Sequence, residues 1–571
     1  MNAESARTRH LVADRIVERL LALQISTVFG VHGANAEDLW AAAVRHPDVT
    51  PVTAKHEFGA GAMADGLSRI TGAPSAVLTT SGGAALNVVP ALGEAYDSRV
   101  PVLAVIGSAG RASVGRGGFQ DMLSPPDTID LSRVLSGVVG TCAVVEEPAA
   151  LDAAFDMAYE SLHAGCPAAL VIPKDVQAAP AETPSGAVSG RCGAQRPDDP
   201  PAAVIDDLAR LLVRVAASDG ALCIWAGEEA SRLRLAWAVS ELTELLGATS
   251  VVSPGGRDVG GVGCAGVTGV MGHPSALRAV RDAEVCLVLG CRMSLTDRGG
   301  FDDALGDATV IHLGAHAPRA PGIGEHIPTP DLTAMVRALI AAVRDHHGER
   351  CRDPAPVPIE YLTTPSTDAA LPMRTAVELI GAHLPLDSSV FADAGNAGAT
   401  TIHHLPFGAG RFVVALGMGG MGHAIAAGIG AAIGTARAST RGTARHGAPR
   451  SVVIAGDGSF FMHGMELHTA IEYDAPVTLI VLNNNAHGMC VTRESLYFPE
   501  YPGSNRFRPT DIAAGVNAMF GDLEVRHADD PDSLRAACAE LLNRPGPNCL
   551  VVDVDPDEVP PFAPFLTRGT P

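Results

Sequence analysis

The chain of 571 residues is too long for a single hydrophobic core, and its length predicts about three domains. A formal net charge of −22 and an aromatic content of 4% argue against nucleic acid or an anionic membrane as a partner. No run reaches the roughly 20 apolar residues of a membrane span, and the first residues lack an apolar signal core. The eleven cysteines form no C-x-x-C pair, so we expect reduced thiols in a cytoplasmic protein.

Two proline-containing segments, residues 178–201 and 344–372, predict linkers and divide the chain into three blocks. We therefore predict domains at residues 1–180, 200–343 and 372–560. Each block alternates short β-branched runs with helical stretches, which is typical of doubly wound α/β domains with parallel sheets. Ligands of such domains bind at the carboxyl ends of the strands. The strand candidates are 75–80, 100–106 and 168–172 in the first block, 221–225, 285–289 and 309–313 in the second, and 389–392, 451–455, 477–482 and 549–554 in the third.

In the first block, one carboxylate precedes a predicted helix of small residues. The segment 55–72 reads KHEFGAGAMADGLSRITG, with Glu57 ahead of the helix at 60–69. A lone glutamate is most often a solvated surface charge. The significance of Glu57 therefore depends on what the rest of the chain carries.

The third block contains the most specific pattern, IAGDGSFFMHGMELHTAIEYDAPVTLIVLNNNAHGM at residues 454–489. One strand ends in Gly456-Asp457-Gly458, and the next ends in Asn483-Asn484. A diphosphate needs a hard cation, and Mg²⁺ prefers carboxylate and amide oxygens, which Asp457 and Asn484 supply. The glycines let the backbone approach a phosphate closely. The pattern predicts a magnesium–diphosphate site at two neighbouring strand ends.

Two glycine-containing segments lie upstream in the same block. The first, Asp393-Ala394-Gly395-Asn396-Ala397, follows a predicted strand, and the second, GMGGMG, covers residues 417–422 and includes Met421. A methionine among apolar residues is usually part of a core, and a glycine-rich stretch is usually a turn. Taken alone, neither segment therefore indicates a role in binding.

The GDG motif, the 24 residues from 459 to 482 and the NN pair together resemble the thiamine-diphosphate motif. The flanking residues, including 79–107 of the first block, resemble the acetolactate synthase branch, to which pyruvate decarboxylase and benzoylformate decarboxylase also belong. This resemblance covers roughly residues 10–560. It implies an enzyme that binds thiamine diphosphate and Mg²⁺.

The resemblance also implies roles for individual residues. Asp457, Asn484 and the carbonyl of Ala486 would be metal ligands, and Met421 would hold the cofactor in a V shape. Glu57 would hydrogen-bond N1′ of the aminopyrimidine, favouring the imino tautomer that acts as the base on C2. The other implied cofactor contacts are Gly395, Asn396, Gly419, Gly456, Gly458, Ser459, Gly488 and Met489.

In this family the active site lies between two subunits, so the resemblance implies a homo-oligomer, either a dimer or a tetramer. Gly118-Phe119-Gln120-Asp121 resembles the segment that lines the substrate site from the neighbouring subunit. His32 and Gly33 occupy a loop that would also face the substrate, although His32 stands where relatives have proline. A role for His32 in acid–base chemistry is a hypothesis beside that of an ordinary loop histidine.

Three functions are compatible with these residues. The first is a carboligase that decarboxylates a 2-oxo acid and transfers the acyl carbanion equivalent to a carbonyl acceptor; the second is a simple 2-oxo acid decarboxylase releasing an aldehyde. The absence of a His-His pair after residues 102–107, and Ala34 in place of an aspartate, favour the first. The third is an idle paralogue, against which the retention of Glu57, Met421, Asp457 and Asn484 argues. Donor and acceptor stay open, because the lysine after Phe119-Gln120 and the tryptophan after the NN pair of acetolactate synthases have no counterparts.

The second block resembles the FAD-binding region of acetolactate synthases at residues 266–272 and 289–292. However, Leu-Gly-Ala-His at 313–316 replaces the expected acidic pair after the next strand. We therefore expect a structural domain rather than a flavin site, with FAD as the alternative.

Overall fold

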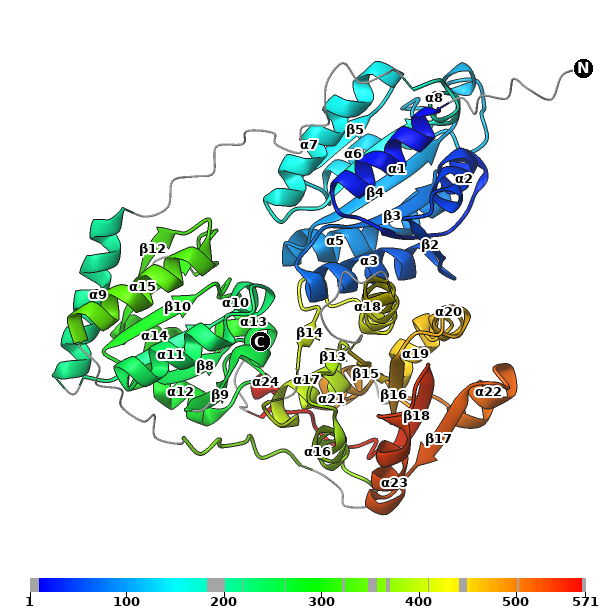
Figure 1. Cartoon of the computed structure of the whole chain (residues 1–571). Coiled ribbons are helices and arrows are strands. Elements are labelled where there is room, and N and C mark those ends of the chain that lie inside the picture. Colours follow the sequence, from blue (N-terminus) through cyan, green and yellow to red (C-terminus); the bar gives the residue numbers. More distant parts are fainter. Residues whose placement is uncertain are drawn as a thin grey trace, which may run out of the picture.

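The computed structural model describes residues 10–181, 201–218, 220–261, 263–320, 324–347, 357–365, 370–408, 410–440, 449–500 and 503–566. Over these ranges the chain forms three six-stranded sheets whose strands pair in parallel, with helices packed against them (Figure 1). The inner strands are almost continuous buried apolar runs, as parallel sheets covered on both faces require, whereas several edge strands are only partly buried. The predicted class of three doubly wound α/β domains is confirmed.

The first sheet has the strand order β2-β1-β3-β4-β6-β5. Its strands β3 and β4 lie in the middle and are buried along their whole length. Its elements are β1 (Thr27–Gly30), β2 (Thr50–Thr53), β3 (Ser75–Thr80), β4 (Val102–Ser108), β5 (Thr141–Val144) and β6 (Ala168–Pro173), with α1 (Val12–Ala22), α2 (Glu37–Arg45), α3 (Glu57–Thr71), α4 (Gly83–Asn87), α5 (Val89–Ser98), α6 (Leu131–Ser136), α7 (Leu151–His163) and α8 (Lys174–Gln177).

The second sheet has the order β12-β11-β10-β7-β8-β9. Counted within the domain this is 3-2-1-4-5-6, the order of dinucleotide-binding folds, with its switch point between β7 and β10. Its elements are β7 (Leu222–Ala226), β8 (Thr249–Val252), β9 (Cys264–Val267), β10 (Val285–Leu289), β11 (Thr309–Gly314) and β12 (Glu325–Pro328), with α9 (Ala202–Ala217), α10 (Glu228–Arg232), α11 (Ala236–Leu246), α12 (Pro274–Arg281), α13 (Leu295–Arg298), α14 (Asp302–Asp307) and α15 (Leu332–His347).

The third sheet, in the order β14-β13-β15-β16-β18-β17, repeats the strand order of the first. Its elements are β13 (Ser389–Ala392), β14 (Phe412–Val414), β15 (Ser451–Gly456), β16 (Val477–Asn483), β17 (Glu524–Ala528) and β18 (Asn548–Asp553), with α16 (Met373–His383), α17 (Asn396–His404), α18 (His423–Thr440), α19 (Asp457–His463), α20 (Glu466–Glu472), α21 (Gly488–Tyr497), α22 (Ile512–Met519), α23 (Pro531–Leu541) and α24 (Ala563–Leu566).

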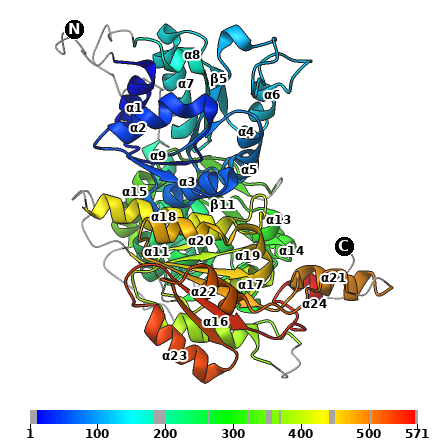
Figure 2. The same ribbon diagram turned by 90° about the vertical axis from the view of Figure 1, so that its right-hand side faces the viewer.

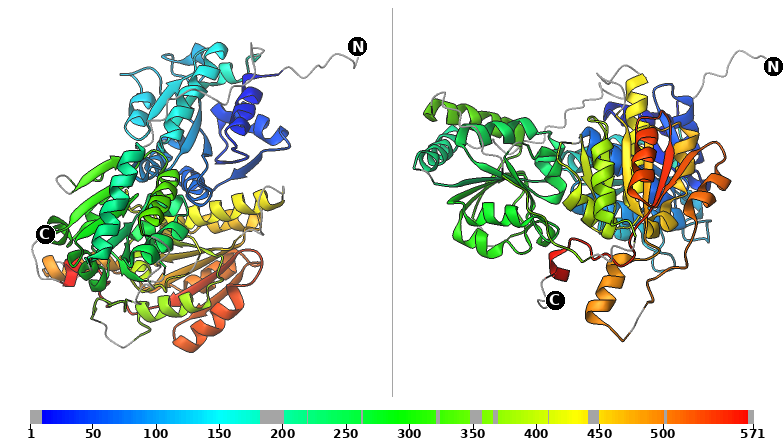
Figure 3. Two further views of the ribbon diagram at one scale, coloured as in Figure 1. Left: turned by 60° about the vertical axis from the view of Figure 1, so that its left-hand side comes forward. Right: turned by 90° about the horizontal axis from the view of Figure 1, so that it is seen from below.

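Helix α18 lies between the first and third sheets and packs against α3 (Figures 2 and 3). Small residues bring the two backbones together: a Cβ on Gly66 would overlap the Ala427 carbonyl, and one on Gly430 would overlap Met63. This crossing joins the helix that begins at Glu57 to the domain that carries Asp457.

The linker predicted at 178–201 lies mostly outside the described residues. Helix α15 continues to His347, so the linker predicted from about residue 344 overlaps its last turn, although the last residue of this helix in the core is Val343. Residues 348–356 and 366–369 of that prediction lie outside the described residues. No described helix combines the length and apolarity that crossing a membrane requires.

Candidate cofactor site

Asp457 and Asn484 come together because β15 and β16 pair in register up to Gly456 and Leu482. The amide of Ala486 donates to Asp457 Oδ2 at 3.2 Å and to Asn484 Oδ1 at 3.1 Å, so both side-chain oxygens converge on one point. Burial raises the pKa of the Asp457 carboxyl to about 6, against the opposing effect of backbone hydrogen bonds. Such a desolvated pair of oxygens is suited to a hard cation, whose charge would hold the carboxylate ionised.

Glycines form an open cradle beside this pair of oxygens. A Cβ on Gly395, Gly419 or Gly456 would meet nothing within 4 Å, so backbone is exposed to free space there. At Gly395 and Gly419 the positive φ angles of 84° and 64° also require glycine. The side-chain oxygen of Asn396 is buried and has no hydrogen-bond partner among the described residues. Because an amide can turn its NH₂ group to the same place, this residue fits a diphosphate above the cradle.

The tip of Met421 lies next to the GDG turn. A Cβ on Gly458 would lie 3.0 Å from Met421 Cε and 2.7 Å from His487 Cδ2. The buried Asp393 carboxylate holds the backbone just after Met421: it accepts from the Gly422 amide at 2.7 Å and from the Ala424 amide at 3.3 Å. Sequence reasoning did not identify Asp393 as a positioning residue; its place at the end of β13 was the available signal.

The remaining predicted cofactor residues lie along the same rim. Ser459 is fully buried in the first turn of α19. Gly488 begins α21, and a Cβ there would lie 2.5 Å from Asn396 Nδ2 and 2.6 Å from Asn484 Nδ2. Met489 is partly buried against the core that includes the third sheet.

Glu57 is the first residue of α3 and is half-buried. Its Oε2 accepts a hydrogen bond of 2.9 Å from Asn87 Nδ2, a partner that sequence reasoning did not identify. Within the described part of one chain, the structure does not bring the Glu57 carboxylate into hydrogen-bonding contact with Asp457 or Asn484.

The predicted substrate residues divide into two pairs. Gly33 packs on Thr80, the last residue of β3, and the Thr80 hydroxyl donates to Gln120 Oε1 at 3.3 Å. Gly33 and Gln120 therefore lie at the carboxyl end of β3. His32 and Phe119 are exposed in one chain, Phe119 by 72%.

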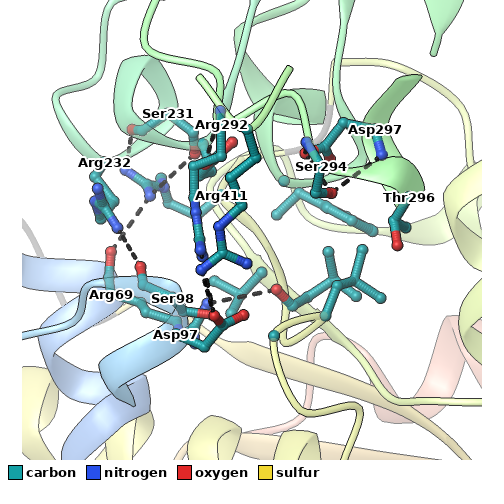
Figure 4. Close-up of a pocket in the computed structure, with 18 residues that line it drawn as sticks. Arg69, Asp97, Ser98, Ser231, Arg232, Arg292, Ser294, Thr296, Asp297 and Arg411 are labelled. Atoms are coloured by element: carbon teal, nitrogen blue, oxygen red, sulfur yellow. Dashed lines mark hydrogen bonds and ion pairs between the residues drawn. The ribbon is translucent and has the colours of Figure 1, made fainter. Parts of the chain in front are cut away.

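A cavity of about 240 Å³ lies where the three domains meet, and it is lined by charged side chains (Figure 4). In this lining, Asp97 of the first domain accepts hydrogen bonds from two arginines of the second domain, Arg319 at 2.6 Å and Arg292 at 3.3 Å. Burial and the charge of Asp297 raise the pKa of Glu228 to about 7. The labelled lining residues are Arg69, Asp97, Ser98, Ser231, Arg232, Arg292, Ser294, Thr296, Asp297 and Arg411.

The neighbouring crevice of the second sheet departs from a dinucleotide site at the helix that follows the first strand. A dinucleotide places its diphosphate on free amides at the helix that follows the first strand. Here that helix, α10, begins with two carboxylates, and their oxygens already accept from strand-end amides: Glu228 from Arg292 at 3.2 Å and Glu229 from Ala315 at 3.3 Å. The Glu229 amide at this helix N-terminus also donates to the Gly290 carbonyl at 3.0 Å. A diphosphate would therefore meet two carboxylates and an occupied amide at α10, although Arg99, Arg232 and Arg292 line the same crevice.

Comparison with known proteins gives two family matches. Residues 11–131 match the thiamine pyrophosphate enzyme N-terminal TPP binding domain, and residues 393–552 match the C-terminal TPP binding domain. The chain is 26% identical to the acetolactate synthase isozyme 1 large subunit of Escherichia coli, over 98% of this chain and 97% of that one. It is 25% identical to the mitochondrial acetolactate synthase catalytic subunit of Saccharomyces cerevisiae, over 98% and 83%.

Solved structures share the fold. Benzoylformate decarboxylase from Polynucleobacter necessarius aligns with a TM-score of 0.78 at 18% identity, over 96% of this chain and all of that one. The 4-hydroxybenzoylformate decarboxylase of Rhodococcus jostii aligns with a TM-score of 0.76 at 19% identity, over 95% and 99%.

With the matched domains containing both Glu57 and the Asp457–Asn484 pair, the chain belongs to the thiamine pyrophosphate enzymes. Within that class it is an acetolactate synthase-like enzyme.

Proposed function

We propose that this enzyme is a Mg²⁺-dependent carboligase, which decarboxylates a 2-oxo acid and transfers the acyl carbanion equivalent to a carbonyl acceptor. The observation that carries the cofactor assignment is the convergence of the Asp457 and Asn484 oxygens on one amide beside an open glycine cradle. When bound, thiamine diphosphate supplies the nucleophile and the electron sink for decarboxylation.

The chain's own residues would divide the work between binding and proton control. Asp457, Asn484 and the Ala486 carbonyl would hold Mg²⁺, and Met421 would support the cofactor from the side of Gly458. Glu57 would share a proton with N1′ of the aminopyrimidine. The hydrogen bond from Asn87 would orient its carboxylate for this role.

A homo-oligomer, dimer or tetramer, would complete the site. Glu57 does not reach Asp457 within one chain, and large apolar side chains are exposed near the cofactor motifs. A second copy of the chain would cover such side chains and bring its own Glu57 to the cradle. The exposed residues are Phe119, Met418, Phe461, Met462 and Met465.

Product analysis distinguishes the carboligase from the simple decarboxylase. Purified protein with thiamine diphosphate and Mg²⁺ is incubated with a panel of 2-oxo acids, with and without aldehyde or ketone acceptors, and products are identified by mass spectrometry. We expect a hydroxyketone or hydroxy-oxo acid joined from donor and acceptor. If free aldehyde alone accumulates while acceptors are present, the enzyme is a decarboxylase and the carboligase proposal is wrong.

A further inference from the structure

A buried carboxylate of the third domain holds the segment that leads into Glu57. Glu466, in the first turn of α20, is 1% exposed. It accepts from the Lys55 amide at 3.1 and 3.2 Å, from the His56 amide at 3.0 Å and from the Thr469 hydroxyl at 2.8 Å. Since α3 begins at the next residue, Glu466 holds the backbone immediately before Glu57.

A buried carboxylate of the first domain holds the segment that leads into Met421. Glu94, on α5, is 2% exposed. Its Oε2 accepts from the Met418 amide at 2.6 Å, and its Oε1 accepts from the Gly417 amide at 3.3 Å. These two amides begin the GMGGMG segment, whose far end is held by Asp393.

A buried network of charges surrounds Glu94. Arg69 on α3 contacts Glu94 at 3.1 Å and Asp65 at 2.5 Å, and His423 lies 3.3 Å from Asp65. Although burial opposes it, the charges of Arg69 and His423 lower the pKa of Glu94. An ionised acceptor makes stronger hydrogen bonds to amides than a neutral one, so the network strengthens the hold on Gly417 and Met418.

Glycines allow both carboxylates to lie flat against their targets. A Cβ on Gly59 would overlap the Glu466 carboxylate, and one on Gly417 would lie 3.2 Å from Glu94 Oε1 and 2.9 Å from Asp97 Oδ2. Glu466 is fixed by four donor contacts, so its displacement would break hydrogen bonds rather than turn a free side chain.

We infer that Glu466 and Glu94 form a reciprocal clamp, in which a carboxylate of each domain positions the cofactor-facing segment of the other. Glu466 is a positioning residue for Glu57, and Glu94 is a positioning residue for Met421. The inference rests on the proposed function, since it assigns these two segments to activation and binding of thiamine diphosphate.

The clamp predicts that Glu466 affects activation of the bound cofactor, whereas Glu94 affects its binding. In the full-length protein, Glu466→Gln should slow deuterium exchange at C2 of bound thiamine diphosphate by about tenfold or more, with its Kd changed less than about twofold. Glu94→Gln should raise the Kd for thiamine diphosphate with Mg²⁺ by about tenfold or more. Exchange is measured by NMR after acid quench, and Kd by titration calorimetry.

Glu472→Gln is the matched control for Glu466. It lies on the same helix, but its carboxylate contacts the Lys55 ammonium at 2.5 Å rather than a backbone amide. We expect it to leave both the exchange rate and the Kd unchanged. Gly59→Ala disturbs the Glu466 half and Gly417→Ala the Glu94 half, and neither changes a charge. We expect Gly59→Ala to slow exchange and Gly417→Ala to raise the Kd. These variants replace a glutamine variant that does not fold.

The outcomes separate the clamp from the proposed function. If both halves change exchange and Kd together, in proportion to a loss of thermal stability, the carboxylates are structural only and the clamp is wrong. Unchanged values in all four variants also overturn it. Wild-type protein that binds thiamine diphosphate and consumes 2-oxo acids keeps the proposed function intact in either case, whereas wild-type protein that does neither overturns the proposed function itself.

Discussion

Gly456 and Gly458 flank Asp457, yet an added methyl group would have different effects at the two positions. A Cβ on Gly456 meets nothing within 4 Å, and its φ of −82° suits any residue. Gly456→Ala should therefore leave the free energy of unfolding within about 0.5 kcal/mol of wild type. It should still weaken thiamine diphosphate binding, because the free space is where we expect the diphosphate.

Gly458→Ala should lower both the free energy of unfolding and the affinity for thiamine diphosphate, since its Cβ would lie close to His487 and Met421. Urea unfolding gives the stabilities, and titration calorimetry with Mg²⁺ gives the affinities. Equal cofactor affinity of Gly456→Ala and wild type would contradict the location of the cradle.

Sequence spacing predicts the Asp457–Asn484 pair because both residues follow strands, and parallel strands end at one edge. Glu466 and Glu94 lie within helices and carry no such pattern. Their targets are backbone amides more than 300 residues away along the chain, which a single acidic residue in a helix does not indicate. Asp393 does follow a strand, but its sequence position does not indicate that it accepts from the Gly422 amide. These contacts depend on how domains and neighbouring segments pack.

Glycines in two helices, α3 and α22, differ in how closely other residues approach them. On α3, Gly66→Ala would push its new methyl group into the Ala427 carbonyl of α18, and overpacking of this kind costs about 1–3 kcal/mol. On α22, Gly515→Ala is exposed and meets nothing, so better helix propensity should stabilise the protein by up to about 1 kcal/mol.

The midpoints of urea unfolding should therefore move in opposite directions, at constant slope. An unchanged midpoint for Gly66→Ala would mean that α3 and α18 are not in close contact. The helix at 60–69 could be predicted from its small residues. Its packing against α18 could not, because glycine and alanine indicate a close approach but do not identify the helix that approaches.

Two stacked histidines join the second and third domains. The rings of His273 and His403 stack at 4.3 Å; the Val267 amide donates to His273 and the Leu362 amide to His403. Burial lowers the pKa of His273 to about 3 and that of His403 to about 4, so both stay neutral in the fold.

Acidification should therefore destabilise the protein through these histidines. The unfolded chain binds protons at a pKa of about 6.5 and the native one does not, so stability is lost as the pH falls from about 6.5 towards 4. From pH 7.5 to pH 5, the free energy of unfolding should fall by about 2–4 kcal/mol more in wild type than in a His273→Asn, His403→Gln variant. Parallel pH profiles of the two proteins would exclude this contribution.

The three-domain architecture could be predicted from alternating strand and helix patterns, because parallel strands buried on both faces are distinctive. The carboxylates that occupy the crevice of the second domain could not be predicted as such, since Glu228 and Glu229 become significant only where they meet the amides of Arg292 and Ala315.

Carbon dioxide release by wild type and Glu57→Gln shows whether Glu57 activates the bound thiamine diphosphate. Both proteins are saturated with thiamine diphosphate and Mg²⁺ and supplied with the 2-oxo acid that wild type consumes fastest. Because the amide cannot take up the proton as a carboxylate does, the variant should bind the cofactor normally but release carbon dioxide at least about 100-fold more slowly. Release at the wild-type rate by Glu57→Gln would exclude Glu57 as the activating carboxylate.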